Sequence, residues 1–290
     1  MNPLLNSSRR GFEPSVLTAP GALNTAARAR MEGCLGEPCF LADWLDVLMC
    51  HLEVDARALQ AVTPFRIDCY QGRAFVSLVF FTMRNMRPRL GGWCSRLLFR
   101  PIATHPFLNV RTYVEHDGET GIYFISEWLS NRLSVRLGPA MFGLPYRLGR
   151  FSGQNRLDDE GMLTGDVADA SSGEAVRIAG SLAGNTFGPC SSGSLDEWLM
   201  ERYTAFTHCG GVSRYFRVWH PPWLQVTADV RVKDDGLLRR NWPWMADARL
   251  IGANYSTGLR DVWMGRPRRL TQVTCAPVAH ARSARILACR

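Results

Sequence analysis

The sequence predicts a mainly β protein of the α+β class, an antiparallel barrel or sandwich with two or three helices. Short segments rich in β-branched and aromatic residues recur along the chain. Turn-forming residues separate these segments, and helical patterns do not alternate regularly with them, as they do around a parallel sheet. The 290 residues are 46% hydrophobic and 21% charged, which is ordinary for a globular protein with a substantial core.

The N-terminal segment, residues 1–38, is rich in Pro, Gly, Ser and Ala without periodicity, which predicts a flexible leader. The run Ser8-Arg9-Arg10-Gly11-Phe12 has the form of a twin-arginine export motif. The residues after it are only weakly apolar, and Glu13, Pro14 and Pro20 interrupt them. A leader on a cytoplasmic protein is therefore favoured, with export as the alternative.

The first ordered elements follow from apolar runs and capping residues. A strand is expected around Leu45–Leu52, where the chain is strongly apolar. Asp55 is placed to cap a short helix, Ala56–Val62, which Pro64 ends. The run Arg73–Met83, full of Phe, Val and Leu, predicts the next strand.

A hairpin is the clearest local prediction. Asn109–His116 and Gly121–Trp128 are rich in β-branched and aromatic residues, and Asp117-Gly118 between them is a strong turn signal. A helix is expected at Asn131–Phe142, with Pro139 disturbing its last turn.

The second half of the chain is predicted to hold strands and one capped helix. Residues 161–184 indicate two strands around Ser171-Ser172-Gly173. Ser194 and Glu197 form a capping box. Helical spacing beyond this box places five apolar residues on one face: Leu195, Trp198, Leu199, Tyr203 and Phe206. Further strands are expected around Tyr215–Trp219, Leu224–Val232 and Thr257–Trp263.

Several segments carry a family resemblance in the expected order. They are Val54–Pro64, Gly72–Val76, Pro106–Val114, Trp198–Tyr203 and His220–Trp223. Together they resemble the YqjF-like proteins, a domain-of-unknown-function family of the acetoacetate decarboxylase-like superfamily. The resemblance implies a single domain, residues 39–270, built as a closed, cone-like antiparallel β-barrel with flanking helices and a cavity. Residues 271–290 fall outside it and are expected to be a disordered basic tail.

The resemblance also implies a missing nucleophile. Pro145-Tyr146-Arg147-Leu148-Gly149 resembles a Pro-Lys-Lys-Leu-Gly run of acetoacetate decarboxylases, whose first lysine forms a Schiff base with the substrate. Tyr146 stands in place of that lysine, and Asn109 stands in place of a glutamate on the signature strand. Lys233, the only lysine of the chain, lies where a strand is expected to run into an Asp-Gly turn. Schiff-base decarboxylation is therefore not expected.

Four residues are predicted to bind a ligand. Asn109, Arg111 and Tyr113 share one face of a strand because strand side chains alternate, and the family comparison suggests that this face lines the cavity. A buried arginine needs an anionic partner, either a ligand carboxylate or an internal salt bridge with Glu127. Tyr146 is the fourth, as a hydrogen-bond donor to a carbonyl or as a core residue.

Tyr146 and His220 are the candidate catalytic residues. His220 precedes Pro221-Pro222 and is either an acid-base group near neutral pH or a structural residue. Glu201 and Arg202 are expected on a solvated face of the capped helix rather than at the barrel mouth.

Other function classes find no support in the sequence. There is no Gly-x-Ser-x-Gly elbow, P-loop, Rossmann fingerprint or His-Glu-x-x-His motif, and the nine cysteines include no Cys-x-x-Cys. No cofactor and no metal site are expected, and the thiols are expected to be reduced, as in the cytoplasm.

The expected partner is a small organic ligand. The net charge of +8 lies largely in residues 1–30 and 271–290, which carry three net positive charges each. No nucleic-acid partner is therefore expected. No membrane partner is expected either, because no apolar run approaches about 18 residues. A homo-oligomer remains open.

Three functions compete. The first is a small-molecule-binding barrel for an organic acid or carbonyl compound, and the second is a lyase or isomerase that uses non-covalent acid-base chemistry on a keto acid. The third is a filled barrel that serves as an interaction module. Two converging acid-base groups would favour the enzyme, whereas Arg111 among apolar walls would favour binding.

Overall fold

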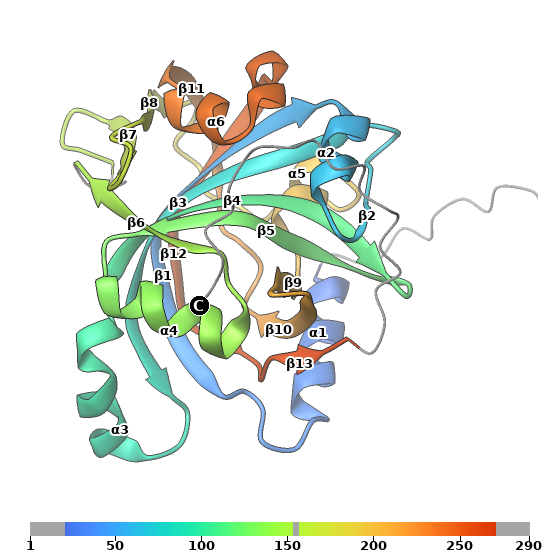
Figure 1. The fold of residues 1–290 in the computed structure, drawn as a ribbon, viewed down its shortest axis with the longest axis vertical. Coiled ribbons are helices and arrows are strands. Elements are labelled where there is room, and N and C mark those ends of the chain that lie inside the picture. Colours follow the sequence, from blue (N-terminus) through green and yellow to red (C-terminus); the bar gives the residue numbers. More distant parts are fainter. Residues whose placement is uncertain (1–20, 153–156, 271–290) are drawn as a thin grey trace, which may run out of the picture.

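In a computed structural model, which describes residues 21–152 and 157–270, thirteen strands form one continuous sheet that curls on itself (Figure 1). The strands are β1 Phe40–Val54, β2 Arg66–Ile67, β3 Ala74–Pro88, β4 His105–His116, β5 Glu119–Leu129, β6 Tyr146–Phe151, β7 Met162–Asp169, β8 Ala175–Leu182, β9 Thr204–Cys209, β10 Val212–Trp219, β11 Val226–Asp234, β12 Arg249–Met264 and β13 Arg268–Arg269. The helices are α1 Ala22–Glu32, α2 Ala56–Val62, α3 Gly92–Phe99, α4 Arg132–Phe142, α5 Leu195–Met200 and α6 Gly236–Asn241, with two short 3-10 turns, η1 Arg100–Ile102 and η2 Pro243–Asp247.

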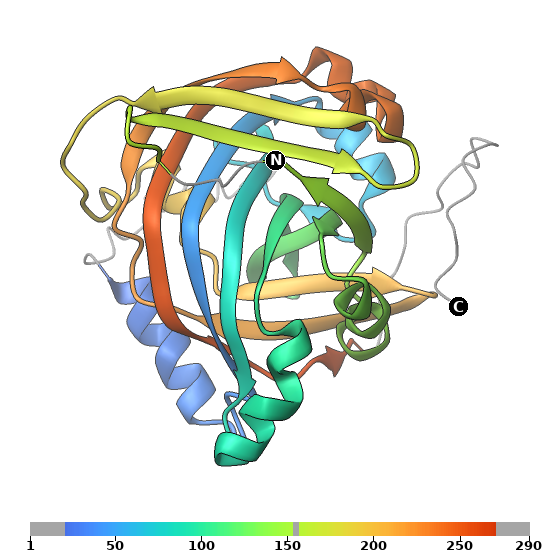
Figure 2. The same ribbon diagram turned by 90° about the vertical axis from the view of Figure 1, so that its left-hand side faces the viewer.

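The strands β12, β1, β3, β4 and β5 form a central sheet that two other groups of strands enclose. On one side, β9 and β10 bridge β5 to β12. On the other side, β6, β7, β8 and β11 connect the same two strands. Figure 2 shows β12, β1 and β3 side by side as long curved strands.

The ring through β9 and β10 is only partly closed. The β10–β12 junction holds two residue pairs, Val218 opposite Met264 and Trp219 opposite Trp263, and the β5–β9 junction is equally short. The strand-rich α+β class is confirmed. The pairings of β5 with β6 and with β9 are parallel, so the sheet is not wholly antiparallel as the sequence predicted.

Alternation along the central strands divides the core into two clusters, because successive side chains point to opposite faces. One face packs against β7, β8 and β11. The cluster formed there includes Leu48, Leu78 and Leu108 of the central strands and Val167, Ile178 and Val226 of the covering strands. The other face packs against β9 and β10. The cluster formed there includes Met49, Val79 and Phe107 of the central strands, Ala205 of β9 and Phe216 of β10. The second cluster contains the cavity described below.

Several local predictions are confirmed. The Asp55 carboxylate accepts a hydrogen bond from the Ala58 amide and caps α2. Asp117 and Gly118 both have positive φ, 51° and 79°, as a two-residue turn between right-twisted strands requires. The Asn131 side chain caps α4. No helix in the described ranges is long and apolar enough to cross a membrane.

The predicted flexible leader is wrong for its second half. Residues 22–32 form α1, whose Ala27 and Met31 are buried, while Arg28 lies over the ring of Trp219, 5.1 Å from its centroid. Two buried residues four apart fix this helix to β10, a pattern too sparse to stand out as periodic. Residues 1–20 and the predicted basic tail, 271–290, lie outside the described residues.

The helix after the capping box is shorter than predicted. Ser194 accepts a hydrogen bond from the Glu197 amide as expected, but α5 ends at Met200. Phe206 therefore lies in β9 and pairs with Tyr215 of β10, and Tyr203 lies between helix and strand. The helical spacing of Tyr203 and Phe206 was accidental, because pairing with β10 gives this segment its backbone hydrogen bonds instead.

Candidate functional site

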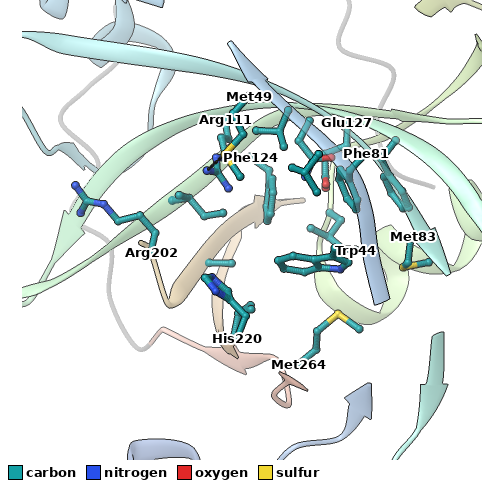
Figure 3. A pocket seen from close by; sticks show the side chains of 18 of the residues that line it. Trp44, Met49, Phe81, Met83, Arg111, Phe124, Glu127, Arg202, His220 and Met264 are labelled. Atoms are coloured by element: carbon teal, nitrogen blue, oxygen red, sulfur yellow. Dashed lines mark hydrogen bonds between the residues drawn. The ribbon is translucent and has the colours of Figure 1, made fainter. Parts of the chain in front are cut away.

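A cavity of about 100 Å³ lies between the central sheet and β9 and β10 (Figure 3). Its wall is largely apolar, with aromatic and methionine side chains such as Trp44, Met49, Phe81, Phe107, Phe124 and Trp223. The polar side chains in the wall are Asn109, Arg111, Glu127, Tyr146, Arg202, Thr204 and His220. Few polar groups in an apolar cavity are typical of a small-molecule site.

Arg111 is a buried cation without an acidic partner among the described residues. Its side chain lies in β4 and is 8% exposed. Its Nη2 lies 3.3 Å from the carbonyl oxygen of Leu199 and 3.6 Å from Met49 Sδ, and its Nε has no hydrogen-bond partner in the described chain. A cation in such a position is costly unless an anion joins it.

The alternative of an internal salt bridge from Arg111 to Glu127 is wrong. The two strands shift register between Val110 and Arg111, so that Glu127 lies opposite Asn109, whereas Arg111 lies opposite Phe124. Figure 3 shows the Phe124 ring between the side chains of Arg111 and Glu127. The shift thus places Glu127 on the wall that Arg111 also lines, but opposite Asn109 and not opposite Arg111.

The positive charge of Arg111 reaches other groups around the cavity. Burial, with a smaller contribution from the Arg111 charge, lowers the pKa of His51 to about 3 and the pKa of His220 to about 4. Burial also lowers the pKa of Arg202, and Arg111 contributes to that shift. This end of the cavity is therefore electropositive.

Glu127 forms the second polar end of the cavity. Its side chain is 2% exposed, and its strand neighbours are Asn109 on β4 and Tyr146 on β6. Glu127 Oε2 and Asn109 Oδ1 have no hydrogen-bond partner within the described residues. Burial raises the pKa of Glu127 well above its usual range. Burial thus favours the protonated carboxyl, which can donate a hydrogen bond.

Tyr146, which replaces the Schiff-base lysine, lines the cavity as predicted. Its ring rests on Gly138 of α4, where a Cβ would lie 2.2 Å from Tyr146 Cε2. Burial, followed by the neighbouring Glu127, raises the pKa of Tyr146 well above its usual range, so the phenol stays protonated. Arg147 points to the opposite face, where its guanidinium donates to Asn241 Oδ1 over 2.8 Å.

Tyr113 does not line the cavity, which corrects the prediction that it faces a ligand. It is fully buried, and its hydroxyl hydrogen-bonds Ser77 Oγ at 2.6 Å and the Leu199 carbonyl at 3.0 Å. Its face is as predicted, but α5 covers it, and Trp198 packs on its ring with centroids 4.6 Å apart.

His220 lines the cavity. The sequence suggested an acid-base group near neutral pH, but burial lowers the pKa of His220 to about 4, so the residue does not titrate there. In the neutral ring, Nδ1–H donates to the Pro221 carbonyl over 2.7 Å, which leaves Nε2 as an acceptor. The rings of Tyr203 and Trp223 pack against it. The residue can accept a hydrogen bond from a ligand and is a weak base.

Arg202 and Glu201 are buried, which corrects their expected place on a solvated helix face. Arg202 lines the cavity, but its guanidinium points away from Arg111 and bonds Asp68 at 2.8 Å (Figure 3). Glu201 accepts hydrogen bonds from the Tyr203 hydroxyl and the Trp223 amide. These bonds hold the segment between α5 and β9, which forms part of the cavity wall.

Two chemistries need groups that this wall lacks. Lys233 is exposed on β11 and is not part of the cavity wall, so no lysine amine is available there. Among the described residues, no group of three or more His, Cys, Asp or Glu side chains could hold a metal ion.

Comparison with known proteins agrees with this fold. A profile for DUF2071, described as an uncharacterized conserved protein, matches residues 41–248. The uncharacterized protein YqjF of Bacillus subtilis (strain 168) is 31% identical over 195 residues, 65% of this chain and 76% of YqjF.

Two solved structures share the architecture at low sequence identity. Acetoacetate decarboxylase from Legionella pneumophila is 13% identical with a TM-score of 0.53, over 80% of this chain and 87% of that one. The enduracididine biosynthesis enzyme MppR, complexed with pyruvate, is 13% identical with a TM-score of 0.53, over 81% and 91%. The profile match over most of the described strands, together with this shared architecture, shows that the chain belongs to the DUF2071 family and has an acetoacetate decarboxylase-like fold.

Proposed function

We propose that this protein binds a small organic acid that also carries a carbonyl group, such as a 2- or 3-keto acid. The observation that carries the proposal is the buried guanidinium of Arg111, which lines the cavity and has no acidic partner among the described residues. A ligand carboxylate supplies the missing anion and accepts two parallel hydrogen bonds from the guanidinium fork.

The other end of the cavity suits the carbonyl group. Glu127 is neutral and can donate a hydrogen bond, and Tyr146 and Asn109 flank it on the neighbouring strands. Phe124 between the two ends gives the middle of the ligand an apolar contact. A molecule with a carboxylate at one end and a carbonyl oxygen at the other matches this order of groups.

The structural relatives support this ligand class. The structure of MppR contains pyruvate, and the name of acetoacetate decarboxylase gives acetoacetate as its substrate; both are small keto acids. Their identity to this chain is low, so the proposal depends on the wall residues of this chain and not on that likeness.

A thermal-shift titration tests the proposal. Pyruvate and acetoacetate are expected to stabilise the parent protein, and their uncharged methyl esters are not. Arg111→Gln is expected to abolish the stabilisation, whereas Arg147→Gln, on the opposite face, leaves it unchanged. Stabilisation by esters and acids alike, or retention of the effect in a folded Arg111→Gln variant, would refute an anion site at Arg111.

A second candidate function is acid-base catalysis on the same ligands, as in a lyase or isomerase. The Glu127 carboxyl favours it, because a protonated acid beside a carbonyl oxygen stabilises the enol that forms when a neighbouring C–H bond gives its proton to a base. In this wall the acceptor for that proton is Nε2 of His220. In deuterated buffer, this function predicts exchange of the protons next to the pyruvate carbonyl, seen by NMR and lost in Glu127→Gln. Binding without exchange would leave the first function alone.

We also propose a cytoplasmic location. The seven cysteines of the described ranges form no disulfide, which supports a reducing compartment. Complete labelling of these thiols is the expected result when cells are lysed directly into a denaturing buffer that contains a maleimide, and cysteine pairs that react only after reduction would argue against it.

A further inference from the structure

One surface of the molecule is unusually apolar. Twelve large hydrophobic residues are exposed in the described chain, and seven of them lie in two short segments. Four belong to α3 and the residue pair before it, and three belong to α4: Leu90, Trp93, Leu97, Leu98, Leu133, Leu137 and Met141. Trp93 is 75% exposed and Leu98 is 76% exposed, so both stand almost free of the rest of the fold.

The two segments form one surface, which we call the α3–α4 surface. The Asn131 side chain at the start of α4 donates to the Pro101 carbonyl of η1, which follows α3, over 2.6 Å. Phe99 of α3 and Phe142 of α4 both pack on Phe40, with ring centroids 5.7 and 5.9 Å away. Figures 1 and 2 show the two helices near each other at one end of the barrel.

The same surface is basic. Residues 89–103 and 131–143 contain five arginines and no Asp or Glu. All five arginines are exposed, and the side chains of four of them have no ion pair or hydrogen bond to another described residue: Arg96, Arg100, Arg132 and Arg136. Exposed leucines and a tryptophan among unpaired arginines are typical of helices that lie in the interface of an anionic membrane.

We propose that the α3–α4 surface binds the surface of an anionic lipid bilayer. Trp93 and the leucines would enter the boundary between headgroups and acyl chains, and the arginines would pair with lipid phosphates. This replaces the expectation of no membrane partner, which rested on the lack of a spanning segment. The mode of binding is attachment to one leaflet.

Charge argues against a second copy of the chain as the occupant. A symmetric dimer through this surface would bring two sets of unpaired arginines together, and neither set has an acid to answer the other. An anionic bilayer supplies the opposite charge, and each arginine near it contributes about 1 kcal/mol.

The test is co-sedimentation of the full chain with phosphatidylcholine vesicles that contain or lack phosphatidylglycerol. Binding is expected only with the anionic lipid and is expected to weaken with salt. Arg96→Gln with Arg100→Gln is expected to lower the affinity about thirtyfold, since two contributions of about 1 kcal/mol each are lost. Trp93→Ser with Leu97→Ser is expected to abolish binding. Arg57→Gln and Leu224→Ser, both exposed on other parts of the chain, are the matched controls.

Three results would overturn the proposal: no binding to either vesicle, equal binding to both, or equal loss in the control variants. Light scattering in the absence of lipid tests whether a second copy of the chain covers this surface instead. A dimer that dissociates in the Trp93→Ser, Leu97→Ser variant would show that a second copy covers this surface.

Discussion

Arg111 and Tyr113 share one hydrogen-bond acceptor, the carbonyl oxygen of Leu199 at the end of α5, at 3.3 and 3.0 Å. Tyr113 also bonds Ser77 Oγ, which in turn bonds His51 Nδ1 at 2.8 Å. This buried network thus holds the Leu199 carbonyl in place, and that carbonyl in turn orients the guanidinium of Arg111. Tyr113 acts on the site through Leu199, without contact to the cavity.

Tyr113→Phe should therefore affect stability more than binding. Loss of the hydroxyl leaves Ser77 and Leu199 with one partner fewer, so we expect a decrease of about 1–2 kcal/mol in the free energy of unfolding. Carboxylate affinity should change by no more than a few-fold. Urea denaturation and ligand titration measure the two effects. A loss of affinity as large as that of Arg111→Gln would place Tyr113 in the cavity after all.

Gly138→Ala should disturb the cavity from outside. The new Cβ would lie 2.2 Å from Tyr146 Cε2, so the ring must move, and overpacking of this kind costs about 1–3 kcal/mol. In a Tyr146→Ala background the clash is absent. The better helix propensity of alanine should then make Gly138→Ala stabilising, by up to about 1 kcal/mol relative to Tyr146→Ala alone. Urea denaturation of both single variants and the double variant tests this. Equal effects of Gly138→Ala in both backgrounds would contradict it.

Glu127→Gln should change how stability depends on pH. Because the pKa of Glu127 is raised in the folded protein, the folded state binds more protons than the unfolded state between the ordinary value of 4.5 and the raised value. This contribution to stability is complete below pH 4.5 and is lost as pH rises, by about 1.4 kcal/mol per pH unit. Glutamine does not titrate and removes that loss, so the free energy of unfolding of the variant should increase relative to that of the parent as pH rises from 5. Parallel curves in urea denaturation would show that Glu127 is ionised in the folded state.

The sequence predicted those elements whose signals are local. Asp55 capped α2, and Asp117-Gly118 formed the hairpin turn, because a cap and a tight turn need only neighbouring residues. The end of α5 depended on the start of β9, which pairs with the distant strand β5 as well as with its neighbour β10. Such contacts override helical spacing.

The site shows the same limit. Counted from the pairing of His116 with Glu119, an even ladder would place Asn109 opposite Ser126. The extra residue in β5 moves Glu127 to that position, and so onto the cavity wall that Asn109 and Arg111 also line. Alternation alone correctly grouped Asn109 and Arg111 on the cavity wall, but a β-bulge has no dependable sequence signal here. The role of Glu127 as a second polar end could therefore not be predicted.

The proposed ligand should bind more weakly at high pH, and Glu127 should be the cause. From pH 5 to pH 9 a small keto acid stays ionised. His220 has its pKa lowered to about 4 and Tyr146 has its pKa raised above the ordinary range, so neither changes charge in this interval. Burial raises the pKa of Glu127 well above its usual range, and once the pH passes that raised pKa the carboxyl loses its donor and gains a charge that repels the ligand.

The affinity of the parent for pyruvate should thus decrease by up to about tenfold per pH unit above the pKa of Glu127, the limit for one linked proton. In Glu127→Gln the amide donates at every pH, so the affinity should be flat, and Arg147→Gln should follow the parent. Isothermal titration in buffers of different ionisation enthalpy gives both the affinity and the proton release. A parent affinity that does not change with pH would mean that the carbonyl of the ligand does not meet Glu127.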